Sequence, residues 1–107
     1  MDIAHQAFAC REAAIVLAEL GSEAKRRLLL SMADELEFQA DAILAANAQD
    51  MVNAERCGTR GAMLDRLRLD EVRLSAIANA VRDVASLPDP VGQITREEIR
   101  PNGICVQ

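Results

Sequence analysis

Apolar residues recur at every third or fourth position through most of this 107-residue chain, and the pattern stops at Pro88 and Pro90. This spacing places the apolar side chains on one face of a helix. Proline cannot continue a helix, and it pushes the preceding residue out of the helical region. The sequence therefore predicts a mainly α-helical chain as far as residue 92 and a different kind of structure after it.

The apolar residues are themselves unusual for a folded core. They include 19 alanines and 12 leucines, whereas the chain has two phenylalanines and no tryptophan or tyrosine. Alanine is the best helix former, but it buries little surface, and aromatic side chains bury the most. We therefore expect a thin core, either in one small domain or in a piece of a larger one that needs a partner surface.

Three to four helices are expected. Residues 2–20 form the first, which Gly21 ends as a C′ residue, and residues 22–56 form one kinked helix or two in succession, with Ser22 as the N-cap. The first apolar stripe is expected at Ile3, Ala7, Cys10, Ala14 and Leu17, and the second at Leu29, Met32, Ala33 and Leu36. A short helical segment at 62–69 then leads to Asp70, which caps a last clear helix that ends before Pro88.

The last 15 residues have the pattern of a β-hairpin. Two short strands are expected at 93–99 and 104–107, on either side of the Asn102-Gly103 turn signal. A two-stranded hairpin is marginal in water, so it requires a neighbouring sheet or chain. A second strand that runs to Gln107 is typical of a chain interrupted within a structure.

Charge, cysteine content and hydropathy exclude several classes of function. The net charge of −5 has the wrong sign for nucleic-acid binding. Cys10, Cys57 and Cys105 form no zinc or disulfide pattern, which favours reduced thiols and a cytoplasmic location. The chain has no signal-peptide pattern and no run of 18 apolar residues, so we expect no membrane association.

No complete catalytic, cofactor-binding or metal site can be assigned from residue spacing. His5 has no nucleophile paired with it, and Cys57 is best explained as a spectator thiol in a loop. The Gly58-Thr59 and Gly61 segment follows no strand and lacks the phosphate-loop order. The remaining charged clusters are expected to be solvated helix faces: Lys25, Arg26 and Arg27, and Asp34, Glu35, Glu37 and Asp41.

Four short runs nevertheless occur in a distinctive order: Met32-Ala33-Asp34-Glu35-Leu36, Ala46-Asn47-Ala48-Gln49-Asp50, Met63-Leu64-Asp65-Arg66-Leu67 and Leu87-Pro88-Asp89-Pro90-Val91-Gly92-Gln93. Together they resemble the N-terminal region of the gamma-glutamyl phosphate reductase (glutamate-5-semialdehyde dehydrogenase) family. The resemblance extends over essentially the whole chain. Arg100-Pro101-Asn102 also resembles an active-site motif of that family, but Asn102 lies in the hairpin and takes no catalytic role.

The resemblance implies an N-terminal fragment of an α/β enzyme of the aldehyde dehydrogenase superfamily. Such an enzyme reduces L-glutamate 5-phosphate with NADPH to L-glutamate 5-semialdehyde and phosphate, in proline biosynthesis, through a cysteine thioester. In the family the nucleophile and the cofactor-binding residues lie farther along the chain. We therefore expect this segment alone to bind no cofactor and to be inactive.

The same resemblance implies a division of the chain into two parts. Residues 1–92 are expected to be the helical segment of the cofactor-binding domain, and residues 93–107 the start of a β-arm through which a homo-oligomer assembles. The alternative is an independent helical module that pairs with another protein or with itself through its apolar stripes. That alternative explains neither the hairpin nor the order of the four runs.

Overall fold

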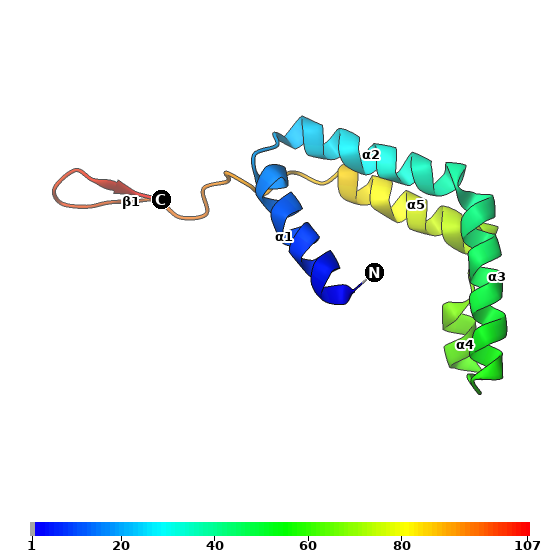
Figure 1. The fold of residues 1–107 in the computed structure, drawn as a ribbon. Helices are drawn as coiled ribbons and strands as arrows, with labels where there is room; N and C mark the ends of the chain where they lie inside the picture. The colour runs from blue at the N-terminus through cyan, green and yellow to red at the C-terminus, as the bar shows by residue number, and fades with distance from the viewer. Residues whose placement is uncertain (1) are drawn as a thin grey trace.

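Two long helices, α2 (Ser22–Phe38) and α5 (Glu71–Ala85), lie side by side at the centre of the fold (Figure 1). The computed structural model describes residues 2–107. Ala33 of α2 and Ala78 of α5 are completely buried. Leu74 and Ala85 complete the buried apolar core of the described residues. This is the thin, alanine-rich core that the composition predicts.

Two further helices cover one end of this pair. The single residue Gln39 separates α2 from α3 (Ala40–Arg56), so the predicted segment 22–56 is two helices in succession. The short helix α4 (Ala62–Leu67) lies beside α3, and α3 also contacts α5 (Figure 1). Asp70 caps α5 as predicted, because its Oδ1 accepts a hydrogen bond of 2.8 Å from the backbone N–H of Arg73.

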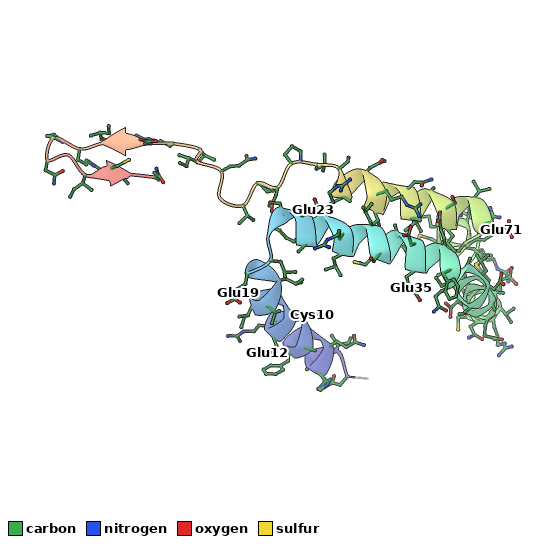
Figure 2. The ribbon with its side chains drawn as sticks, turned by 90° about the horizontal axis from the view of Figure 1, so that it is seen from above. Cys10, Glu12, Glu19, Glu23, Glu35 and Glu71 are labelled. Carbon is green, nitrogen blue, oxygen red and sulfur yellow. The ribbon has the colours of Figure 1, made fainter. Side chains whose placement is uncertain are left out.

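The first helix, α1 (Ile3–Ala18), is capped by Asp2, and none of its residues is buried. The predicted helix is confirmed, but its predicted buried stripe is wrong for this structure: Cys10 and the other stripe residues are exposed. Figure 2 shows Cys10 and Glu12 on a helix that stands clear of α2. Phe8, Ile15 and Val16, outside the stripe, are also exposed, so α1 is apolar on several sides.

Gly21 begins α2 instead of ending α1. Helix α1 already ends at Ala18, and Gly21 has a φ of −70°, which is not the left-handed conformation of a C′ glycine. Gly21 is therefore the N-cap of α2, and Ser22 is its first residue. The predicted N-cap role of Ser22 is therefore wrong. Its hydroxyl donates a hydrogen bond to Asp89 and does not cap the helix.

The predicted hairpin is present, with shorter strands. Strand β1 (Glu98–Ile99) pairs antiparallel with β2 (Cys105–Val106), in a register that places Ile99 opposite Cys105. Only Gly103 in the turn has positive φ, at 84°. Asn102 contributes through its side chain, because its Oδ1 accepts from the N–H of Ile104 at 3.2 Å. The hairpin extends away from the helices (Figure 1).

The resulting molecule is long and open. Its radius of gyration is 20.7 Å and its longest extent 70 Å, whereas a compact domain of this length has a radius of gyration of about 13 Å. Its accessible surface is 8729 Å²; a compact monomer of this mass exposes about 5,800 Å². The chain therefore exposes about 2,900 Å² more than a compact protein of its size would.

Candidate functional site

Asp89 anchors the segment that leaves the helices toward the hairpin. Its carboxylate lies 2.5 Å from Nζ of Lys25 and accepts a 2.9 Å hydrogen bond from Oγ of Ser22. The backbone N–H of Val91 also donates to it, at 3.0 Å. These partners lower the pKa of Asp89 to about 2, with the hydrogen bond from Lys25 as the largest cause. Lys25 was expected to point outward, and this ion pair corrects that prediction.

Arg82 of α5 ties the two central helices together. Its guanidinium lies 2.8 Å from Oδ1 of Asp34 and 2.7 Å from Oε2 of Glu37, both on α2. The hydrogen bond from Arg82 is the main reason why the pKa of Glu37 is lowered, and the two carboxylates in turn raise the pKa of Arg82. The two acidic side chains are exposed, as expected of a solvated helix face, and they also hold a helix contact.

Asn47 fixes the turn between α4 and α5. Its side-chain nitrogen donates to the carbonyl of Leu67 at 2.9 Å, and its side-chain oxygen accepts from the N–H of Leu69 at 2.8 Å. Asn47 is the one buried polar residue among the described residues, with 8% of its surface exposed. A single amide side chain therefore satisfies two backbone groups in a place where water has little access.

Arg73 and Asp65 hold the same turn from its other side. Nη2 of Arg73 lies 3.0 Å from Oδ2 of Asp65, and Nη1 donates to the carbonyls of Asp65 and, at 2.8 Å, Arg68. The hydrogen bonds from Arg73 are the largest cause of the lowered pKa of Asp65, and those from Arg68 come second. Nη2 of Arg73 contacts both carboxylate oxygens of Asp65, and this pairing connects α4 to the start of α5.

Each of the four sequence runs that carry the family resemblance contributes a residue to one of these four contacts. Each run contains one polar side chain that joins two elements of the fold: Asp34, Asn47, Asp65 and Asp89. In this structure these four side chains hold the helices and the connecting segments in their arrangement. Spacing alone could not reveal these roles, because each partner lies elsewhere in the sequence.

One cavity of about 560 Å³ lies between the start of α2 and the end of α5. Apolar side chains form most of its wall, among them Leu29, Val84 and Leu87, and Lys25 and Asp89 lie at its polar end. The ammonium of Lys25 is already paired with the carboxylate of Asp89 at this end of the cavity.

The structure does not combine the sequence-predicted candidates into a reactive site. His5, Cys57 and Cys105 are exposed and lie on α1, at the end of α3 and on β2. The backbone N–H groups of Gly58 and Thr59 donate to carbonyls in the last turn of α3, so they cannot cradle a phosphate.

Two kinds of site are also absent from the part of the chain that the structure describes. Residues 2–107 contain no group of three or more His, Cys, Asp or Glu side chains suited to a metal ion. None of the described helices combines the length and the hydropathy needed to cross a bilayer.

The sequence and this arrangement of helices have clear counterparts among known proteins. The chain is 58% identical, over all 107 residues, to the gamma-glutamyl phosphate reductase of Xanthomonas axonopodis pv. citri, and 56% identical over 105 residues to that of Xylella fastidiosa. The crystal structure of gamma-glutamyl phosphate reductase from Thermotoga maritima matches 89% of the chain, with a TM-score of 0.82 and 30% identity. No protein-family model matches the chain.

These similarities confirm the resemblance inferred from the four runs, and they limit its extent. The chain spans 26% of the Xanthomonas reductase, 24% of the Xylella reductase and 23% of the Thermotoga chain. It corresponds to the N-terminal quarter of these enzymes. The fold of this chain is thus similar to that of a part of the Thermotoga reductase.

Proposed function

We propose that this chain is the N-terminal segment of a gamma-glutamyl phosphate reductase, and that the complete enzyme reduces L-glutamate 5-phosphate with NADPH to L-glutamate 5-semialdehyde and phosphate. The observation that carries the proposal is the 58% identity to a reductase along all 107 residues. The similarity in fold to the Thermotoga enzyme supports it independently. The reaction belongs to proline biosynthesis, and we place the enzyme in the cytoplasm and in the aldehyde dehydrogenase superfamily.

In this proposal the chain supplies structure, and the chemistry lies in the rest of the enzyme. Several of its charged side chains are engaged in contacts that hold the fold, such as Arg82 with Asp34 and Lys25 with Asp89. In the cavity between α2 and α5 the ammonium of Lys25 is paired with Asp89, so it is not free to bind a phosphate of NADPH. We therefore assign nicotinamide binding and the thioester-forming cysteine to the remaining three quarters of the polypeptide.

The two parts of the chain have different tasks in this proposal. Residues 1–92 form a helical layer of the cofactor-binding domain, and residues 93–107 begin a β-arm for homo-oligomer assembly. The hairpin extends away from the helices (Figure 1), and both its strands are exposed. Unpaired strand edges are templates for a further strand, which supports assembly through this arm.

An independent interaction module remains the second candidate, because so much apolar surface is exposed. Ile3, Phe8 and Phe38, for example, each expose more than half of their surface. Exposed apolar surface of this extent marks an interaction site in a soluble protein. The two candidates differ in whether that surface serves the catalytic activity of a longer chain.

A full-length chimera distinguishes the two candidates. In it, this chain replaces the corresponding segment of the Xanthomonas axonopodis reductase, and NADPH oxidation is followed with L-glutamate 5-phosphate as substrate. We expect the chimera to retain kcat and KM within about tenfold of the parent enzyme, and the 107-residue chain alone to show no activity. A folded chimera without activity, or activity of the chain alone, would contradict the proposal.

A further inference from the structure

The pair of helices α2 and α5 has one charged side. In an α-helix each residue is rotated by about 100° from the one before it. Asp34 follows the buried Ala33, and Asn79 follows the buried Ala78. The two helices run in opposite directions (Figure 1), so both of these residues lie on the same side of the pair. Arg82 confirms this, because it bonds both Asn79 and Asp34.

The opposite side of the pair is apolar. Met32 precedes Ala33 on α2, and Ile77 and Val84 precede Ala78 and Ala85 on α5. The same rotation therefore places these three side chains together on the other side, where Leu28 joins Met32 one turn away. Met32 is 50% exposed and Ile77 is 44% exposed. We call Leu28, Met32, Ile77 and Val84 the apolar face.

The extent of the uncovered surface identifies the kind of partner. The excess of about 2,900 Å² over a compact monomer is more than three times the roughly 800 Å² that each partner contributes to a standard interface. A second copy on the apolar face would leave most of this excess exposed, α1 included. The matched reductases continue for about three times the length of this chain, since it spans 26% of the Xanthomonas enzyme. A polypeptide of that length supplies the required area.

We propose that the apolar face packs against the remaining three quarters of the reductase polypeptide, and that the side carrying Asp34, Asn79 and Arg82 faces solvent. This inference rests on the proposed function, and it adds the orientation of the helical layer. The cavity beside Lys25 and Asp89 lies at one end of the same face, because Val84 belongs to both. The packing therefore covers this cavity as well.

Oxidation of Met32 by hydrogen peroxide tests the orientation without any substitution. The rate of sulfoxide formation at Met32 is measured by peptide mass spectrometry in the 107-residue chain and in the full-length chimera. We expect oxidation to be at least tenfold slower in the chimera, because the neighbouring surface excludes solvent. Equal rates in the two proteins would overturn the inference, even if the chimera is active. Protection in the 107-residue chain that increases with its concentration would also overturn it, since a second copy would then cover the face.

A pair of matched variants of the chimera provides an independent readout. Ile77→Asp introduces a charge on the apolar face, and Asn79→Asp introduces one on the opposite side of the same helix. We expect Ile77→Asp to lower the melting temperature or the soluble yield markedly, and Asn79→Asp to leave both unchanged. Equal effects of the two substitutions would contradict the assigned orientation. Loss of activity in a folded chimera with Met32 protected would instead contradict the proposed function alone.

Discussion

Asn47 is the residue on which the turn between α4 and α5 most depends. Asn47→Ala leaves the carbonyl of Leu67 and the N–H of Leu69 without a partner in a partly buried place. We expect a loss of about 1–3 kcal/mol in the free energy of unfolding, measured by urea denaturation of the 107-residue chain. Gln49→Ala, at an exposed position of the same helix, is the matched control. Equal losses for the two variants would contradict the role given to Asn47.

Asp89 gives the fold a dependence on acidic pH. Its pKa is about 2 in the folded chain, below its ordinary value of 3.8. A carboxyl group whose pKa is lowered by folding stabilises the fold above its unfolded pKa, and that contribution disappears as the pH falls through the folded pKa. We therefore expect the melting temperature to fall between about pH 4 and pH 2, and to fall less in Asp89→Asn.

The control for Asp89→Asn removes a carboxylate that is not part of the ion pair with Lys25. Asp50 is an exposed carboxyl on α3, so Asp50→Asn is the matched control. We expect its melting temperature to follow that of the unsubstituted chain throughout the acidic range. If Asp89→Asn and Asp50→Asn lose stability in parallel between pH 4 and pH 2, the ion pair with Lys25 does not hold the segment.

At the level of single residues, sequence reasoning identified local roles better than distant ones. Asp70 was predicted as an N-cap because its partner is only three residues away. Asp89 and Lys25 are separated by 64 positions, and Asp34 and Arg82 by 48. No periodicity links such pairs, since the fold alone brings them together. In the sequence, only one member of each pair, Asp34 or Asp89, belonged to one of the four runs that carry the resemblance.

The pairing of α2 with α5 depends on small side chains. Ala33 and Ala78 are completely buried where the helices meet, so a larger side chain there forces the helices apart. We expect Ala78→Leu to lower the free energy of unfolding by about 1–3 kcal/mol. Ala80→Leu, at an exposed position of α5, is the control and should leave it nearly unchanged. Urea denaturation followed by circular dichroism measures both; equal stability of the two variants would place the helix contact elsewhere.

At the level of elements, the helices were predicted more accurately than their surroundings. The apolar spacing identified every helix, because 3.6-residue periodicity is a property of the element itself. The same spacing predicted a buried stripe on α1, yet burial requires a second surface, and α1 has none in this chain. The strands were also predicted too long, because a strand requires a paired neighbour. In this structure only Glu98–Ile99 and Cys105–Val106 pair with each other.

At the level of the whole molecule, the open shape follows from the composition. Alanine-rich helices with two phenylalanines cannot enclose a large core, and the chain instead presents apolar surface on α1 and on the α2–α5 pair. Such surface is typical of a layer within a larger protein. The chain is similar to about a quarter of each matched reductase.

Hydrogen exchange of the α1 amides tests this account most directly, because all residues of α1 are exposed in the chain alone. The measurement compares the 107-residue chain with the full-length chimera under identical conditions. If the chain is the N-terminal segment of a reductase, the amides of α1 exchange rapidly in the chain alone and at least a hundredfold more slowly in the chimera. Equally rapid exchange in both proteins, with the chimera active, would contradict the claim that the rest of the enzyme completes this fold.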